Sequence, residues 1–492
     1  MSVTCAHAAA RAASALAAAG ANAGDRKMFR ASARRAAPRR GAARVAAVTA
    51  EAAVDVSTVE DKWIAGSLER CAPASGVAAL RDAALANLAH ARMPTQRVEE
   101  YRFTDLAPLV TAKPSAAADP ADADIDASAW TLKSADASRV VLVDGVFRAD
   151  LSDLSGVGSA VRVGTLSSGE AAPALGTVSS QRGGVIADLN AVMASDAVVL
   201  DVPAGARLET PLHVVQLSTG AGGDAMSASA PRVVVTLGDG AEATVVEDFA
   251  AAPGSVGEGA YWHNGVCEMV LGKGAKLTHA MVQAQSRSAV HTRATYLTQA
   301  EESEYKLAEI NVGGKIGRHD LGITQLGPRT NTELACFNLA GAGQCLDLHS
   351  SVTLDHEESA TDQVHKCIVS AASGRGVFDG NVQVNKMAQR TDAGQISRNL
   401  LLVPKATVNV KPNLQIVADD VVCTHGCTVS DLEEEELFYI QSRGLSPTTA
   451  RSLLVAGFGL EIVSKLEHED LRTRVSGVVR NALDEDDVIL AV

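Results

Sequence analysis

A short glycine-containing pattern recurs through the middle of the chain, and its spacing limits the folds that the chain can adopt. The pattern reads PAGARLET from Pro203, GDGAEAT from Gly238, GKGAKLT from Gly272 and GAGQCLDL from Gly341. The central glycines Gly205, Gly240 and Gly274 are almost evenly spaced, and Gly343 follows at twice that interval, which indicates two periods with one degenerate copy. One strand–turn–strand unit cannot bury its apolar side alone, but coils stacked about 4.8 Å apart share a continuous core. The repeat therefore predicts a β-solenoid, with a β-sandwich of similar hairpins as the alternative.

Between residues 140 and 425 the chain has the pattern of short strands. Runs of β-branched and alternating residues are interrupted by Gly, Asp or Pro. Examples are Val140 to Val143, Leu212 to Leu217, Val233 to Leu237 and Val266 to Leu271. Only 3% of the residues are aromatic and 41 are glycine, which favours tight bends over a helical bundle. We therefore expect a mainly β core over residues 129–428.

Helical patterns precede this core. Ser57 to Arg70 and Val77 to Arg92 carry apolar residues at helical spacing, and Pro94 ends the second run. The stretch from Thr111 to Ser128 is rich in Ala, Asp and Pro, which indicates a linker. Residues 51–128 are therefore predicted to form an N-terminal helical region and a linker.

A second helical region is predicted after the core, over residues 429–492. Ser430 and Glu433 form a capping-box pattern before the first helix, and Gly444 is its expected C-cap. Ser446 with Pro447 begins a second helix that runs to residue 466. The third helix is outlined by its apolar residues, Leu471, Val475, Val478, Val479 and Leu483.

The first 50 residues differ in charge from the rest of the chain. They contain eight Arg and one Lys but a single acidic residue, Asp25. This composition is typical of an organelle transit peptide, predicted here over residues 1–50; a basic arm that binds nucleic acid is the alternative. Without the segment the net charge changes from −14 to −22, so we expect no attraction to nucleic acid or to an anionic membrane. No apolar run approaches the ~20 residues of a membrane-spanning helix.

The cysteines are spaced as free thiols, because the seven beyond the leader contain no CxxC pair. If residues 419–427 are extended, the period-two alternation of a strand puts Cys423, His425 and Cys427 on one face. Thiolate and imidazole suit iron, iron–sulfur clusters or zinc, so this face could hold a cluster or accept sulfur. The alternative is structural, with buried thiols and a histidine that caps a turn, since Cys-x-His-x-Cys matches no closed four-ligand site.

Three segments together resemble the SufB/SufD family. NLQIVADDVVCTHGCTVSDLEEEELFYIQSRGL, from Asn413, is similar to the family run ADDVxCxHGxTV followed by FYxxSRG. GRGVFDGNVQVNKMAQRTDAGQISRNLLL, from Gly374, resembles the SufD-type strand pair that contains AQxTDA and NLLL. RVEEYRFTDLAPL, from Arg97, resembles the family box RxExWKYTDL. The strong matches cover residues 374–466, and weaker ones extend over most of the chain after residue 57.

The resemblance implies a right-handed parallel β-helix between N- and C-terminal helical regions. It also implies a non-enzymatic scaffold subunit in iron–sulfur cluster assembly with two partners. One is a SufB-like paralogue paired through the β-helices, and the other is a SufC-like ABC-type ATPase docked on the C-terminal helices. A location in the chloroplast stroma follows from the family as well, because the leader composition also permits mitochondrial import.

The resemblance also nominates site residues. His425 matches the histidine of the family's Cys-x-His-Gly run and is the candidate for assembly of a transient iron–sulfur cluster, with Cys423 as its companion and second metal ligand. Cys427 stands where the family has a small residue, so its inclusion rests on strand geometry alone. The expected ATPase contact lies between residues 431 and 444, with Leu437, Phe438, Tyr439, Arg443 and Gly444. SufB-type chains carry a cysteine where this sequence reads Ser397, Arg398 and Asn399, which favours a SufD-type assignment.

The sequence gives less support to other functions. The sequence has no G-x-x-x-x-G-K-[ST] loop, so we expect no nucleotide to bind this chain. Four residues of types that bind metals form a loose cluster in the sequence, but histidines on β-rich segments are more often structural. They are His349, Asp355, His356 and His365. A β-helix enzyme acting on carbohydrate and a purely structural solenoid are the alternative functions. The final strands, Ala406 to Val410 and Leu414 to Val422, offer a sheet edge for pairing with the paralogue.

Overall fold

The computed structural model describes residues 48–49, 54–73, 76–117, 125–220, 225–253 and 259–485. The predicted transit segment, residues 1–50, lies outside these ranges except for β1 (Val48–Thr49), which pairs antiparallel with β2 (Gly76–Val77). Part of the predicted linker, residues 118–124, also lies outside them.

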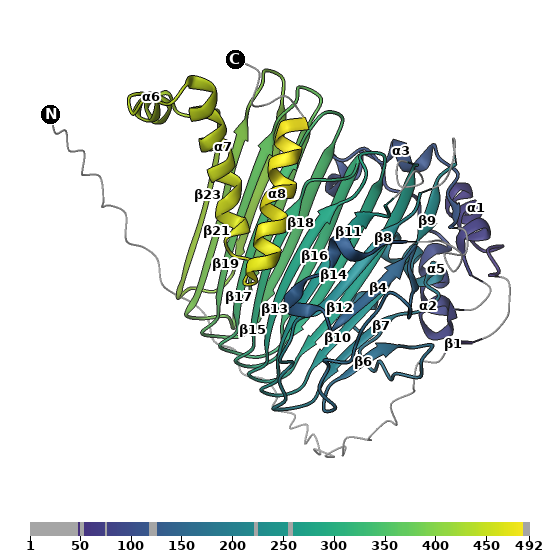
Figure 1. Ribbon diagram of the computed structural model, residues 1–492. Helices are drawn as coiled ribbons and strands as arrows, with labels where there is room; N and C mark the ends of the chain where they lie inside the picture. Colours follow the sequence, from purple (N-terminus) through teal and green to yellow (C-terminus); the bar gives the residue numbers. More distant parts are fainter. Residues whose placement is uncertain are drawn as a thin grey trace, which may run out of the picture. The chain divides into compact units, whose positions relative to one another are not determined.

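Two long sheets form the core of the described chain (Figure 1). The eleven-stranded sheet has the order β22-β20-β18-β16-β14-β12-β10-β7-β6, with β9 beside β12 and β3 beside β9. Its strands are β3 (Ser115–Ala116), β6 (Arg162–Thr165), β7 (Val198–Val202), β9 (Ser227–Ser229), β10 (Arg232–Leu237), β12 (Tyr261–Leu271), β14 (Val290–Gln299), β16 (Ile316–Gln325), β18 (Cys345–Leu354), β20 (Arg375–Val384) and β22 (Thr407–Ile416).

The ten-stranded sheet has the order β23-β21-β19-β17-β15-β13-β11-β8-β4-β5. Its strands are β4 (Arg139–Val143), β5 (Val146–Phe147), β8 (Leu212–Ser218), β11 (Glu242–Ala251), β13 (Lys276–Ala284), β15 (Glu304–Asn311), β17 (Asn331–Ala340), β19 (Ala360–Val369), β21 (Thr391–Leu401) and β23 (Val421–Ser430).

From β7 onwards the chain passes from one sheet to the other, and each long strand pairs in parallel with the strand one turn later. Glu242 pairs with Lys276, and further along Val290 pairs with Ile316, so the later turn is shorter than the earlier one. Among the described residues, antiparallel pairing within these two sheets occurs only near the start of the core, as β4 with β5 and β6 with β7. The parallel pairing confirms the β-solenoid and excludes the β-sandwich, whose hairpins would be antiparallel.

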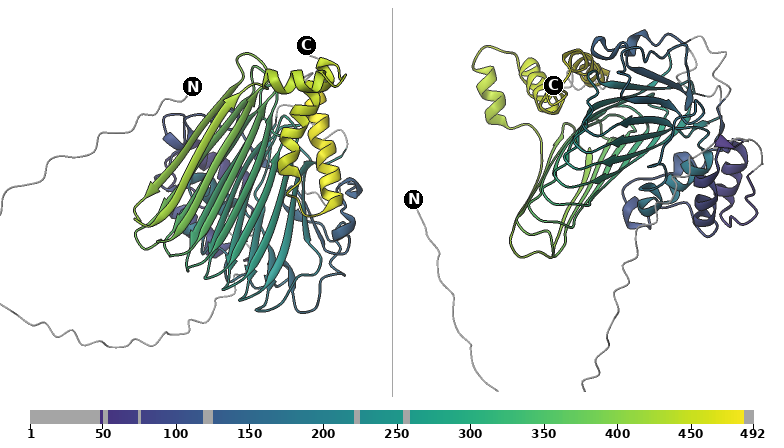
Figure 2. Two further views of the ribbon diagram at one scale, coloured as in Figure 1. Left: turned by 90° about the vertical axis from the view of Figure 1, so that its left-hand side faces the viewer. Right: turned by 90° about the horizontal axis from the view of Figure 1, so that it is seen from below.

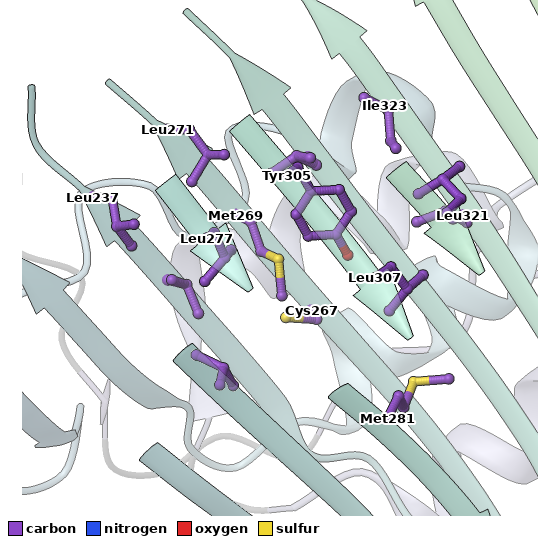
Figure 3. Close-up of a cluster of buried hydrophobic side chains, with 14 of the residues drawn as sticks. Leu237, Cys267, Met269, Leu271, Leu277, Met281, Tyr305, Leu307, Leu321 and Ile323 are labelled. Carbon is purple, nitrogen blue, oxygen red and sulfur yellow. The ribbon is translucent and has the colours of Figure 1, made fainter. Parts of the chain in front are cut away.

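The two sheets share an apolar interior. Because strand side chains alternate, every second residue of each sheet points inward. Figure 3 shows Met269 and Leu271 from one sheet beside Leu277 and Tyr305 from the other, and all four are at most 1% exposed. Burial of a side chain of this size contributes about 1.5–3 kcal/mol, so the stacked turns hold one another together.

The repeat glycines occupy one edge of the solenoid, where the backbone turns with positive φ. Gly240 donates its N–H to the carbonyl of Lys273 on the next turn at 2.7 Å, and Gly274 donates to Glu301 at 2.8 Å. Further along, the same N–H donation is made by residues that also have positive φ, namely Glu302, Arg329, Glu358 and Arg390. Their side chains pair between turns, as Arg329 Nε does with Glu302 at 3.0 Å. At these later turns the residue with positive φ is not glycine, and its side chain forms an ion pair with a neighbouring turn.

The prediction that Gly343 continues this repeat is wrong. Gly343 lies in the turn from β17 to β18, at the opposite edge of the solenoid, whereas Gly274 lies between β12 and β13. The chain makes one half-turn more between these two glycines than the even spacing predicted, because the turns after Gly274 are shorter than those before it. The recurring glycine therefore predicted the architecture but not the length of each turn.

Most of the helices before the long strands pack on the outer face of the eleven-stranded sheet near its start. The helical elements before the long strands are α1 (Lys62–Cys71), α2 (Ala78–Leu88), η1 (Glu99–Tyr101), α3 (Ala107–Val110), η3 (Ser128–Trp130), η4 (Lys133–Ala135), α4 (Ser179–Arg182) and α5 (Val185–Met193). Asp61 caps α1 by accepting from the N–H groups of Trp63 and Ile64. Apolar residues of α1, α2 and α5 pack with outward-facing Trp262 of β12. The predicted linker contains strand β3, which pairs with β9.

The C-terminal helices are α6 (Glu434–Gln441), α7 (Pro447–Val463) and α8 (Glu469–Glu485). Figures 1 and 2 show α7 and α8 along the outer face of the ten-stranded sheet, where their apolar residues join a buried cluster with that sheet. Ser446 caps α7 through the N–H of Thr449, as predicted. The predicted capping box of Ser430 is wrong, because Ser430 ends β23 and Glu433 takes the N-cap position without a side-chain hydrogen bond. None of the helices described here is long and apolar enough to span a bilayer.

Candidate functional site

The last turn of the solenoid holds the predicted site residues. Cys423, His425 and Cys427 lie on β23, which is the edge strand of the ten-stranded sheet. Their register partners on β21 are Ala393, Gln395 and Ser397, which are all buried in the interior. The three side chains therefore share the face that continues the interior, as the period-two alternation predicts.

No later turn among the described residues covers this face. Cys423 is half-buried against the apolar core, whereas His425 and Cys427 are exposed. Across the interior, Val410 and Leu414 of β22 are only partly buried against the same core. The solenoid thus ends on an incomplete layer, in which apolar residues and the two thiols and imidazole are presented together. We call this layer the open end.

Burial affects the protonation of both thiols. Burial raises the pKa of Cys423, and the carboxylate of Asp392 raises it further. Burial also raises the pKa of Cys427. Both cysteines are therefore thiols at neutral pH, and ligation of a metal or a cluster would release a proton from each.

The open end does not form a closed metal site within this chain. Cys423, His425 and Cys427 follow one another in a row, with Cα atoms about 6.4–6.8 Å apart, so they supply at most three donors from one side and not the closed tetrahedral set of a structural metal site. In the part of the chain that the structure describes, no three His, Cys, Asp or Glu side chains are grouped closely enough to hold a metal ion. The open end thus presents donors without forming a closed set of ligands among the described residues.

A buried polar layer lies directly beneath the open end. Gln395 donates from Nε2 to Gln363 Oε1 at 3.0 Å. Ser397 Oγ lies 3.0 Å from Nδ1 of His365, and Asn399 Nδ2 donates to the Thr428 carbonyl of β23 at 2.9 Å. These β21 side chains are at most 2% exposed. Sequence reasoning missed this layer; its only signal was the alternating polar pattern Gln-x-Ser-x-Asn in a strand.

Buried histidines continue the polar contacts deeper in the interior. The ring of His365 stacks on Phe378, with centroids 4.4 Å apart, and burial lowers its pKa to about 3. Nearer the start of the solenoid, His263 stacks on His291 at 5.1 Å, beside the buried pair of Arg293 and Glu247. Burial lowers the pKa of His263 to about 3, and Arg293 lowers it further. These rings are neutral at physiological pH.

The loose cluster of metal-binding residue types is not brought together. His365 points into the interior, while His349 lies on the outer face of the eleven-stranded sheet, 3.0 Å from Asp347. Asp355 and His356 are in the turn after β18, where Gln325 Oε1 accepts from both backbone N–H groups. These four residues therefore form no common site among the described residues.

The predicted ATPase contact is an exposed helix. Helix α6 has no buried residue, and Phe438 and Tyr439 are 74% and 60% exposed. Arg443 donates to Tyr439 Oη at 3.1 Å, and Gly444 turns the chain with a φ of 92° before α7. Two large exposed aromatic side chains on one short helix form an apolar surface that is unusual for a free protein.

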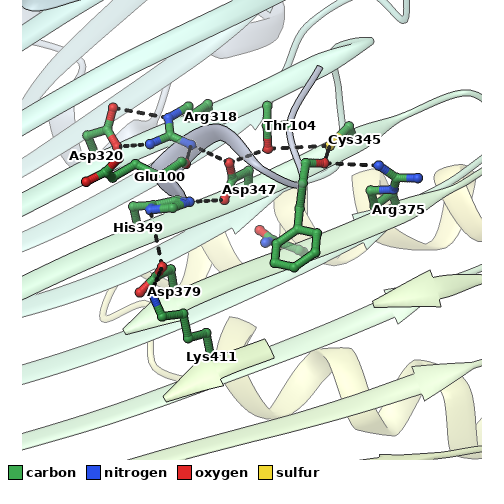
Figure 4. A network of polar contacts seen from close by, with 12 residues as sticks. Glu100, Thr104, Arg318, Asp320, Cys345, Asp347, His349, Arg375, Asp379 and Lys411 are labelled. Carbon is green, nitrogen blue, oxygen red and sulfur yellow. Dashed lines mark hydrogen bonds and ion pairs between the residues drawn. The ribbon is translucent and has the colours of Figure 1, made fainter. Parts of the chain in front are cut away.

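The box from Arg97 to Leu109 docks on the outer face of the eleven-stranded sheet (Figure 4). Arg318 lies over the Tyr101 ring at 4.0 Å and donates to Asp347 at 2.7 Å. Thr104 donates to the same carboxylate, and Arg375 donates to the Phe103 carbonyl at 3.1 Å. A groove of about 730 Å³ borders this network. The sequence marked the box as a motif but did not indicate its partner strands.

Two family models match the chain. The one described as SUF system FeS cluster assembly, SufBD core domain, matches residues 218–458, and the one described as SufBD protein N-terminal region matches residues 69–214.

Three relatives illustrate the similarity. Protein ABCI7, chloroplastic, of Arabidopsis thaliana is 47% identical over 60% of this chain, and the match spans 62% of that relative's length. An iron–sulfur cluster assembly SufBD family protein of Synechocystis is 35% identical over 78% of this chain and 86% of its own length. The iron–sulfur cluster assembly protein SufD of Escherichia coli is 28% identical, over 80% and 89% respectively.

Proposed function

The chain belongs to the SufBD family of iron–sulfur cluster assembly proteins, and we propose that it acts as a non-enzymatic, SufD-type scaffold subunit. The observation that carries this proposal is the open end, where the last described turn of the solenoid leaves His425 and Cys427 exposed and Cys423 half-buried. Soft ligands at an incomplete layer are suited to a cargo that is built there and passed on. A resident site would be closed and buried instead.

A SufB-like paralogue is the partner that completes the site. Strands β22 and β23 are the edges of the two sheets, so they present unpaired backbone N–H and C=O groups along their free sides. Exposed apolar residues lie on or beside the same strands, with Val422 60% and Ile416 46% exposed. A second β-helix that adds its own edge would pair the backbone, cover these residues and bring further ligands to His425.

A SufC-like ATPase is the second partner, and α6 is its docking element. Phe438, Tyr439 and Arg443 form an exposed aromatic and basic surface, with half-buried Leu437 and exposed Gly444 beside it. Aromatic and Arg residues are the types that dominate interface energetics. In this arrangement the nucleotide binds the partner and not this chain.

The cargo is a nascent iron–sulfur cluster, with His425 and Cys423 as its ligands from this chain and Cys427 beside them. Location in the plastid stroma is supported by the basic leader composition and by the relative from Arabidopsis, whose name states that it is chloroplastic.

The test is co-expression of the chain lacking residues 1–50 with SufB- and SufC-like partners, as wild type and as His425→Ala. The complexes are purified without oxygen, and iron and acid-labile sulfide are measured. We expect both complexes to assemble and the variant to contain much less cluster. Ser430→Ala on the exposed end of β23 is a matched control that keeps the cluster content.

Two results would count against the proposal. If the wild-type chain forms no complex, it is not a scaffold subunit. If both complexes carry equal amounts of cluster, His425 is structural and the assembly site lies on the partner.

A further inference from the structure

Two side-chain amides form a short hydrogen-bond ladder beneath the open end, with one step across the interior between the sheets and one step between successive turns. Gln363 of β19 donates from Nε2 to Ser350 Oγ of β18 at 2.6 Å. Gln395 of β21 then donates from Nε2 to Gln363 Oε1 at 3.0 Å. In each step, a side-chain N–H of the residue later in the sequence donates to a side-chain oxygen of the earlier one. Gln363 and Gln395 are register partners on neighbouring strands, so the step between them follows the solenoid axis.

The ladder ends on an acceptor without a donor. Oε1 of Gln395 is buried and accepts no hydrogen bond from any residue that the structure describes. A buried acceptor left without a partner costs about 1–3 kcal/mol, so a donor at this position is strongly favoured. The amide cannot simply move away, because it fills the space left by Gly380. A Cβ on Gly380 would lie 2.9 Å from Gln395 Cδ.

The next residue along the ladder is His425. It is the register partner of Gln395 on β23, and both side chains point to the interior face. Register partners in parallel strands lie side by side about 4.8 Å apart, which brings the imidazole alongside the amide. His425 is thus the residue of β23 that lies directly opposite Gln395.

We propose that Gln395 is the positioning residue of His425. The structure shows no hydrogen bond between the two side chains, so the His425 ring has to turn toward Gln395 for Oε1 to accept its ring N–H. That hydrogen bond fixes one tautomer and leaves the other ring nitrogen unprotonated toward the open end. This inference rests on the proposed role of His425 and adds the feature that prepares it. Histidine ligands are commonly oriented through their second nitrogen in this way, and loss of such a partner typically costs about 10–100-fold in metal affinity.

The tautomer can be measured on the full chain without any partner. Ring-¹⁵N-labelled histidine distinguishes protonated from unprotonated nitrogens by NMR, and the His425 signals are identified by their absence in His425→Ala. We expect a single His425 tautomer in the wild type and both tautomers in Gln395→Met, which has a similar shape but no acceptor. Gln415→Met, on the exposed part of β22, is the matched control and leaves the signals unchanged.

The wild-type spectrum keeps the test informative even if Gln395→Met folds poorly. Mixed His425 tautomers in the wild type, or an unchanged single tautomer in a folded Gln395→Met, would overturn the inference. Either result would do so independently of the cluster content of the complex. In the co-expressed complex, titration with ferrous iron should show an affinity about 10–100-fold lower for Gln395→Met. An unchanged iron affinity would remove the positioning role.

The two proposals fail separately. Loss of cluster in His425→Ala without a Gln395-dependent tautomer leaves the scaffold function standing and removes this inference. A Gln395-dependent tautomer with no effect of His425→Ala on cluster content removes the scaffold role of His425, and the amide ladder is then purely structural.

Discussion

The buried histidines predict that the protein loses stability as the pH falls from 7 to 5. His365 has a pKa lowered to about 3 by burial, although the carboxylates of Glu309 and Asp347 partly oppose that shift. In the unfolded chain the same ring has its ordinary pKa of 6.5. Between these two values the unfolded chain binds a proton that the folded chain does not bind. Stability is therefore fully present above pH 6.5 and decreases as the pH falls toward 3.

The size of the effect follows from the two pKa values. At pH 5 a histidine that stays neutral when folded destabilises the native state by about 2 kcal/mol, against nearly nothing at pH 7. His263 has a pKa of about 3 as well, and the pKa values of His279 and His291 are lowered by burial. Each of them should add a similar amount. Their sum is comparable to the total stability of an ordinary domain, so we expect marked acid sensitivity.

The assay is urea unfolding of the wild type and of His365→Gln at pH 7 and pH 5. Glutamine retains hydrogen-bonding groups near Ser397 but cannot be protonated in this range. The substitution itself changes the free energy of unfolding at pH 7, so the two proteins are compared by how much each one loses on going to pH 5. Between pH 7 and pH 5 the free energy of unfolding of His365→Gln should fall by about 2 kcal/mol less than that of the wild type. Ser397→Ala is the control, because it removes the hydroxyl beside the ring and leaves the titrating group in place.

Equal losses for the wild type and His365→Gln would refute this reasoning. That result would mean that His365 is already protonated in the folded protein, or that its ring is hydrated to the same extent in both states. An equally reduced pH dependence in Ser397→Ala would show that the change came from repacking and not from titration.

Two further predictions concern packing and buried charge. Gly380→Ala should destabilise the protein by about 1–3 kcal/mol in urea unfolding, because the new Cβ would lie 2.6 Å from Phe378 Cζ. Gly426→Ala, where no atom lies within 4 Å, is its neutral control, and equal effects would contradict the packing argument. Arg474→Met should cost about 3 kcal/mol, because it leaves Asp248 buried with only the His213 contact at 2.6 Å. Arg480→Met on the exposed face of α8 should change stability by less than about 0.5 kcal/mol, and a similar loss would count against the ion pair.

The local features of the chain could be predicted because they depend on residues close in sequence. The runs 140–143, 212–217, 233–237 and 266–271 and the cap of α7 by Ser446 fall where the pattern indicated. The predicted final strands, Ala406 to Val410 and Leu414 to Val422, are wrong, because β22 runs unbroken from Thr407 to Ile416 and the next strand begins at Val421. The shared face of Cys423, His425 and Cys427 follows from the alternation of a single strand. Features that combine strands were less accessible. The turns directly after Gly274 are shorter than those before it, so an even spacing assigned Gly343 to the wrong edge.

The sequence by itself determined that the chain forms a mainly β solenoid with helices before and after it. The period of the repeat and the side-chain alternation are local properties, and a turn that cannot bury its own apolar face has to stack. Only the tertiary structure decided which residues meet across turns. Gln395 lies beneath His425 of the following turn, and Arg318 lies beneath Tyr101 from the region before the solenoid. Which residues become such neighbours depends on the combined length of all the turns between them, and no local sequence pattern gives that length.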